Sequence, residues 1–123
     1  MWLWDCKDNE KSGMTEQLKT LCDMATEAHE RVQLNHADID PIVGVHHKMR
    51  QAGFPADVMT IDCLKTGKRI ILILNDDALD VVNYQFSYKD KDPAAEFEQL
   101  AFDELSPAKL YEWMTSYFAR PVS

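Results

Sequence analysis

Glycine, cysteine and long apolar runs are scarce in this chain, and each scarcity excludes a class of protein. The 123 residues include four glycines and three cysteines. An odd cysteine count without a Cys-x-x-Cys pair indicates no disulfide framework and favours a reducing compartment, so we predict a cytoplasmic protein. No apolar run approaches the roughly 18 residues of a membrane-spanning helix. The first residues also lack the basic region of a signal peptide, so we expect no membrane association.

Positive charge is scarce as well. Lysine and arginine number 13 against 21 acidic residues, which gives a net charge of −8. Proteins that bind DNA, RNA or anionic membranes take much of their affinity from lysine and arginine. Direct nucleic-acid binding is therefore disfavoured, and we expect the partner to be another protein with a basic surface.

Sequence motifs for catalysis and metal binding are also absent. The chain has no G-x-S-x-G, G-x-G-x-x-G or H-E-x-x-H motif, and Thr66-Gly67-Lys68 lacks the rest of a phosphate-binding loop. His46 and His47 are adjacent, so on a helix they would point in different directions rather than share one ion. We expect no catalytic residue, no metal ion and no cofactor, and we favour a non-enzymatic protein.

Length and composition indicate one folded domain. A chain of 123 residues with 46% hydrophobic content buries enough surface to fold without a metal or disulfide. We expect residues 14–123 to form a single α+β domain. Residues 1–13, which include Trp2 and Trp4, form an N-terminal arm or an extension.

The segment Arg69–Asn75 is central to the predicted fold. Residues 70–74 are five consecutive large aliphatic side chains between two turns, a pattern typical of a strand buried on both faces. The preceding Lys65–Lys68 segment predicts a tight hairpin with Gly67 at positive φ, which joins this strand to another over 58–64. Residues 81–88 alternate between apolar and polar side chains, which predicts a third strand.

Helices are predicted on both sides of the strands. The first covers residues 15–34. The second begins after Asp40, with Pro41 in its first turn, and ends at Gly53. A C-terminal helix begins at the Ser106 cap. Residues 96–102 fit either a helix or a strand, and we favour a short strand paired with 81–88. The predicted fold is α+β, with two N-terminal helices, a three- or four-stranded antiparallel meander and a C-terminal helix packed on the sheet.

Acidic residues concentrate between residues 72 and 108, where nine acids face two lysines. We interpret the chain as a small interaction protein, of the inhibitor, immunity or adaptor type, that contacts a basic macromolecule through this region. The polar face of residues 81–88 would lie beside it. The candidate interaction residues are Asp76, Asp77, Asp80, Asn83, Gln85, Glu96 and Glu98.

Three alternatives stay open from the sequence. An apolar pocket between sheet and helices would make the chain a small-ligand-binding or enzyme domain, with polar groups from His29, His46, Tyr84 or Tyr88. The acidic residues would instead mimic nucleic-acid phosphates if they were regularly spaced on one face. Exposed strand edges or the N-terminal arm would support a homodimer.

Overall fold

The computed structural model describes residues 16–36, 39, 41–46, 48–88 and 96–118. Among these residues a long helix, α2 (Glu16–Asn35), comes first and is followed by strand β1 (Pro41–His46) and the short helix α3 (Lys48–Gln51). Strands β2 (Ala56–Cys63), β3 (Lys68–Asn75), β4 (Val81–Tyr88) and β5 (Glu98–Ala101) come next. A 3₁₀ turn, η1 (Phe102–Glu104), leads into α4 (Pro107–Trp113), which ends in a π-helical turn, η2 (Met114–Phe118).

The five strands form one antiparallel sheet in the order β1-β2-β3-β4-β5. The prediction of an α+β chain with an antiparallel meander is confirmed, and β3 is its central strand. The hairpin before β3 also forms as expected, with Gly67 at a φ of 74°. The short strand favoured over 96–102 is present as Glu98–Ala101, which pairs with β4.

The predicted second helix is wrong over most of its length. Residues 41–46 form strand β1, which pairs with β2 from Pro41↔Cys63 to His46↔Val58. Three of these six residues are β-branched and Gly44 is a poor helix former, so the local sequence suits a strand once β2 offers a partner. The predicted stop is confirmed: Gly53 has a φ of 100°, and Phe54 N–H donates to the Met49 carbonyl at 2.8 Å. The predicted count of three or four strands is therefore too low, since the sheet has five.

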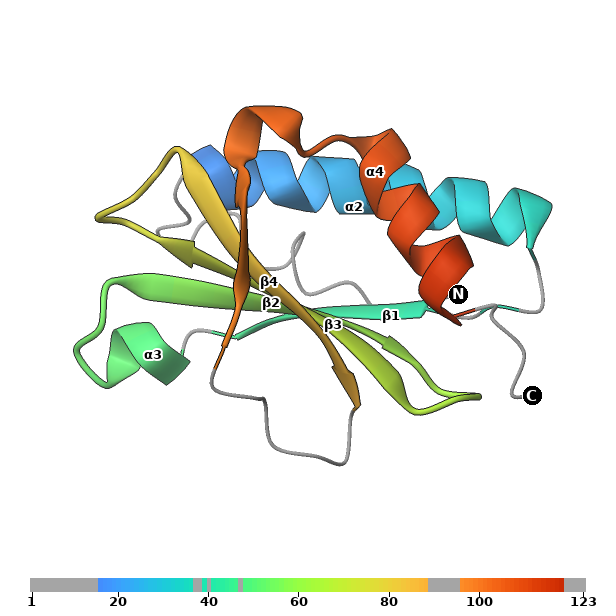
Figure 1. Cartoon of the computed structure of the whole chain (residues 1–123), viewed down its shortest axis with the longest axis horizontal. Helices are drawn as coiled ribbons and strands as arrows, with labels where there is room; N and C mark the ends of the chain where they lie inside the picture. Colours follow the sequence, from blue (N-terminus) through green and yellow to red (C-terminus); the bar gives the residue numbers. More distant parts are fainter. Residues whose placement is uncertain (1–15, 37–38, 40, 47, 89–95, 119–123) are drawn as a thin grey trace.

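The two long helical segments pack on one face of the sheet (Figure 1). Alternate residues of the strands point toward α2 and α4, and the register aligns Val43, Ile61 and Ile70 across three strands. A second row aligns Met59, Leu72 and Tyr84. The most deeply buried side chains of this layer include Leu18, Leu21, Ala25, Ala28, Val32, Met59, Ile61, Ile70, Leu72, Val82, Leu110 and Met114.

The start of α4 follows the sequence prediction. Ser106 is the N-cap and its hydroxyl accepts a hydrogen bond from Lys109 N at 3.1 Å, while Pro107 occupies the first turn. None of the helices among the described residues is long and apolar enough to cross a membrane.

Two cysteines lie in the core. Cys63 is a buried free thiol. Cys22 is also buried and is disulfide-bonded, although the odd cysteine count indicated no disulfide framework. The predicted N-terminal arm, residues 1–13, and the predicted helix cap Asp40 lie outside the described residues.

Candidate functional site

Two acidic segments that are far apart in the sequence meet at one end of the sheet. The β3–β4 turn carries Asp76, Asp77 and Asp80, and the segment after β5 carries Asp103 and Glu104. Val81 pairs with Ala101, and Phe102 N–H donates to the Asp80 carbonyl at 2.8 Å, so the two connections are direct neighbours. We call these five acidic residues the acidic rim.

The backbone holds the acidic rim in a defined shape. The Asn75 side chain accepts a hydrogen bond from Asp77 N at 2.9 Å, and Ala78 N donates to the Asn75 carbonyl at 3.0 Å. Asp76 N is bound to the Pro55 carbonyl at 2.8 Å. Asp76 is half-buried, whereas the other four rim residues are exposed. The rim segments, 75–81 and 101–106, contain no lysine or arginine, so the rim presents concentrated negative charge.

The predicted residues Gln85, Glu96 and Glu98 lie farther along strands β4 and β5. Glu98 is exposed and pairs with Tyr84, so its side chain is on the same face of the sheet as the helices. Gln85 is only 8% exposed, and its amide donates to the Glu96 carbonyl at 2.7 Å. Gln85 therefore fixes the backbone just before β5 to strand β4. The exposed Glu96 and Glu98 extend the acidic surface away from the rim.

Asn83 belongs to the sheet face opposite the helices, which we call the open face. It aligns there with Ile73 on one side and Gln99 on the other. Asn83 is half-buried. The expected polar face of β4 is therefore formed by Asn83, Gln85 and Ser87, but it is separate from the surface that carries Glu98.

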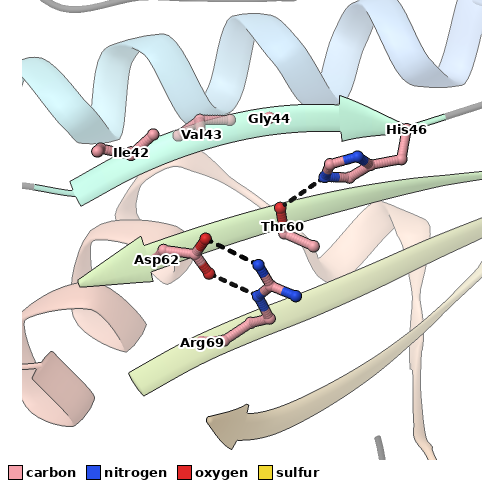
Figure 2. Close-up of a pocket in the computed structure, with 7 residues that line it drawn as sticks. All are labelled: Ile42, Val43, Gly44, His46, Thr60, Asp62 and Arg69. Atoms are coloured by element: carbon pink, nitrogen blue, oxygen red, sulfur yellow. Dashed lines mark hydrogen bonds and ion pairs between the residues drawn. The ribbon is translucent and has the colours of Figure 1, made fainter. Parts of the chain in front are cut away.

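A pocket of about 250 Å³ opens on the open face over strands β1, β2 and β3 (Figure 2). Gly44 explains its position, because a strand residue without a side chain leaves a gap between Ile42 and His46 on the same face. Thr60 pairs with Gly44, and Asp62 pairs with both Ile42 and Arg69. The pocket lining is Ile42, Val43, Gly44, His46, Thr60, Asp62 and Arg69.

Asp62 and Arg69 form a two-pronged ion pair at one end of this pocket. Arg69 Nε donates to one Asp62 carboxylate oxygen at 2.6 Å and Nη2 donates to the other at 3.0 Å. The Asp62 side chain is 12% exposed and the Arg69 side chain 26%. The hydrogen bond to Asp62 raises the pKa of Arg69 above its ordinary value, although burial acts in the opposite direction. Arg69 therefore stays charged.

The sequence contained a signal for this ion pair that the prediction did not use. A hairpin loop centred between Lys65 and Thr66 places Asp62 opposite Arg69, and opposite charges at facing strand positions attract. Side chains alternate between the two faces of a strand, so Thr60 is expected on the same face of β2 as Asp62. The pocket itself was missed because residues 41–46 were assigned to a helix.

The four polar residues predicted to share a pocket lie apart. His29 is buried in the helix layer, where its Nε2 donates to the Pro41 carbonyl at 2.8 Å. His46 lies on the open face, where Nε2 is 3.0 Å from the Thr60 hydroxyl oxygen. Tyr84 and Tyr88 belong to the helix-covered face. Only His46 therefore reaches the pocket described above.

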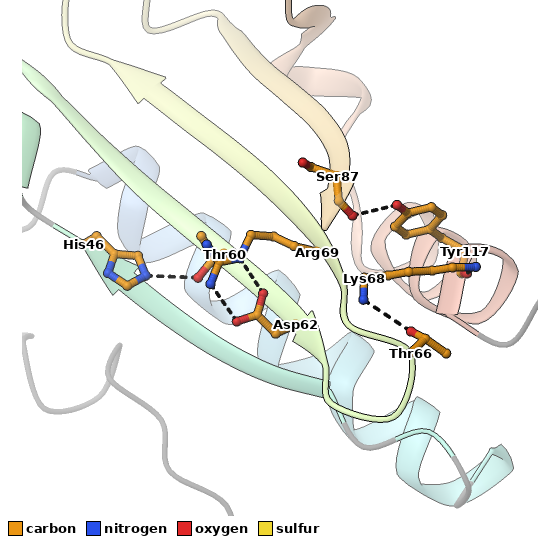
Figure 3. A network of polar contacts seen from close by, with 8 residues as sticks. All are labelled: His46, Thr60, Asp62, Thr66, Lys68, Arg69, Ser87 and Tyr117. Atoms are coloured by element: carbon orange, nitrogen blue, oxygen red, sulfur yellow. Dashed lines mark hydrogen bonds and ion pairs between the residues drawn. The ribbon is translucent and has the colours of Figure 1, made fainter. Parts of the chain in front are cut away.

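A network of polar contacts fixes the end of the C-terminal helical segment to the sheet (Figure 3). The Tyr117 hydroxyl donates to the Ser87 carbonyl at 2.7 Å. The Lys68 ammonium donates to the Tyr117 carbonyl at 3.0 Å and lies 4.9 Å from the centre of the Tyr117 ring. Burial, and secondarily Tyr88, raises the pKa of Tyr117 above its ordinary value.

We expect the stability of the protein to fall in alkali partly through Tyr117. The folded chain holds the Tyr117 proton more tightly than the unfolded chain, so this contribution is complete below about pH 10 and is lost as the pH rises through the folded pKa. Tyr117→Phe should cost about 1 kcal/mol at neutral pH and should flatten the alkaline decline. Urea unfolding at several pH values measures both effects. The control Tyr111→Phe should keep the decline, and an unchanged slope in Tyr117→Phe would contradict this assignment.

The described residues offer no metal centre, since no three histidine, cysteine or acidic side chains among them are grouped to hold an ion. The comparisons with known proteins add no relative: the chain matches no protein-family model, no curated protein and no solved structure. The function must therefore be argued from its own surfaces.

Proposed function

We propose that this protein is a non-enzymatic interaction module that binds a basic protein through the acidic rim and the adjoining edge of β5. The observation that carries the proposal is the contact between the β3–β4 turn and the segment after β5, where Phe102 N–H binds the Asp80 carbonyl at 2.8 Å. This contact gathers acids from two distant segments onto one side of the molecule. A concentrated charge of one sign speeds encounter with an oppositely charged partner and orients it.

Three cations of the β2–β3 hairpin lie far from the acidic rim. Lys65, Lys68 and Arg69 lie at the opposite end of β3 from Asp76 and Asp77. Arg69 is already paired with Asp62, and Lys68 with the Tyr117 carbonyl. The acidic rim is therefore separated from these charges by the length of an eight-residue strand, about 25 Å. At physiological salt that distance is well beyond the screening length of about 8 Å.

The first test is affinity capture from a lysate of the source cells with the immobilised chain. The rim variant Asp77→Asn/Asp80→Asn/Asp103→Asn removes three exposed charges and leaves the half-buried Asp76 intact. We expect a basic protein that elutes as salt rises and that binds this variant about tenfold more weakly in a subsequent titration.

A control variant separates local charge from net charge. Asp23→Asn/Glu27→Gln/Glu30→Gln removes the same number of exposed charges from α2. We expect it to bind the captured partner like the unmodified chain. Binding that is insensitive to salt and equal in the rim variant would show that the acidic rim is not the binding surface.

The pocket over Gly44 favours a second candidate function, the binding of a small ligand on the open face. Its volume of about 250 Å³ lies just below the roughly 300–1,000 Å³ of typical ligand pockets, so this candidate is restricted to a very small molecule. The Thr60 hydroxyl, the His46 ring and the Arg69 guanidinium give it polar groups, and Ile42 provides an apolar wall. This pocket is on the opposite side of the sheet from the helices, so this candidate requires a different surface from the acidic rim.

A further inference from the structure

A cluster of aromatic rings lies on the helix-covered face of β4 and reaches the surface. We call Tyr84, Phe86, Tyr88, Trp113 and Tyr117 the aromatic surface. Phe86 stacks on Tyr117 with ring centres 4.9 Å apart and meets Trp113 edge-on at 5.5 Å. Tyr84 lies 4.7 Å from Trp113. Phe86 and Tyr88 are each 42% exposed, so the cluster offers ring area to solvent.

This cluster already receives one cation from within the chain. The Lys68 ammonium lies 4.9 Å from the centre of the Tyr117 ring, within the range of a cation–π contact. The Tyr117 ring is in turn stacked on Phe86. The geometry of the cluster is therefore compatible with a positive group over an aromatic face.

Two exposed acidic residues lie on the chain segment next to β4. Glu98 faces Tyr84 across the β4–β5 pair and is exposed. Gln85 keeps the exposed Glu96 next to β4 through the 2.7 Å bond to its carbonyl. A guanidinium group fits such a combination better than an ammonium group, because it stacks flat on a ring while donating paired hydrogen bonds to a carboxylate.

We propose that the aromatic surface and Glu98 form an anchor site for an arginine side chain of the basic partner. This inference rests on the proposed function, which makes the partner basic, and it adds the residue type that the partner inserts. The acidic rim attracts positive charge in general, whereas the anchor site distinguishes arginine from lysine.

The experiment compares two short peptides of alternating glycine with either arginine or lysine, each titrated calorimetrically into the full chain at low salt. We expect the arginine peptide to bind about three- to fivefold more tightly, the range of an exposed cation–π contact. Phe86→Leu, which keeps apolar bulk but removes the ring, should abolish this preference. Glu98→Gln should reduce it without altering the packing of the rings.

The matched control is Phe54→Leu, which changes another exposed aromatic residue that lies after α3. It should leave the arginine preference intact. Equal binding of the two peptides by the unmodified chain, or an unchanged preference in Phe86→Leu, would overturn the anchor site. A different result would contradict the proposed function: the rim variant would bind the lysine peptide as tightly as the unmodified chain does.

Discussion

Leu72→Ala is expected to lower the free energy of unfolding by about 2–5 kcal/mol, because it opens a cavity in the middle of the core. Leu72 lies on the central strand, is fully buried, and has Met59 and Tyr84 as its register neighbours. A loss of this size is a large part of the roughly 5–15 kcal/mol that stabilises a typical domain. Urea unfolding followed by circular dichroism measures it.

The adjacent residue provides the control for this prediction. Ile73 follows Leu72 on β3 but points to the open face and is half-buried. Ile73→Ala should therefore lower the free energy of unfolding by only about 1 kcal/mol, because Ile73 buries less apolar surface on folding than Leu72 does. Equal losses in the two variants would show that the helices do not define a single core on the Leu72 side.

Asp62→Ala is expected to cost about 1–3 kcal/mol, because it leaves the partly buried Arg69 guanidinium without its two-pronged acceptor. Arg69 keeps 26% of its side chain in solvent, so the loss should be smaller than for a fully buried pair. High salt should change the result little, since a partly buried pair is only weakly screened. Chemical unfolding of the variant in low and high salt measures the effect.

A double-mutant cycle isolates the interaction between these two residues. Arg69→Met removes the guanidinium and keeps most of the side-chain volume. Asp62→Ala/Arg69→Met should be less destabilised than the sum of the two single changes by about 1 kcal/mol or more. Strict additivity would show that the 2.6 Å and 3.0 Å contacts contribute nothing to stability.

Much of the fold was predictable because local signals and packing agree. The aliphatic run at 70–74, the positive φ of Gly67 and the cap at Ser106 each specify one local structure with little competition. The alternation of residues 81–88 was also sufficient, since β4 has the same bounds in the structure.

The wrong prediction of a helix over residues 41–46 arose where helix and strand signals compete in the local sequence. Pro41 after an acidic residue is a common helix start, yet Ile42, Val43 and Val45 favour a strand. The pairing of β1 with β2 makes this segment a strand, and it joins residues too far apart in sequence for a local pattern to reveal it. Missing β1 also hid the pocket, because the gap left by Gly44 exists only when Ile42 and His46 share a strand face.

The candidate site was partly predictable for the same reason. Composition identified the acids of 72–108, and turn chemistry placed Asp76, Asp77 and Asp80 in one loop. Sequence could not show that Asp103 and Glu104 join them, because this follows from the Val81↔Ala101 register. Nor could it show that Gln85 is buried and holds the Glu96 carbonyl.

The most direct test of binding through the acidic rim is to map the surface that a basic ligand covers. Amide chemical shifts of the isotopically labelled chain, followed during titration with the arginine–glycine peptide, would map that surface. We predict that the largest changes occur at Asp77, Asp80 and Glu98 and extend to Phe86. Changes centred on Gly44 and His46 would contradict it and would place the binding site in the pocket of the open face.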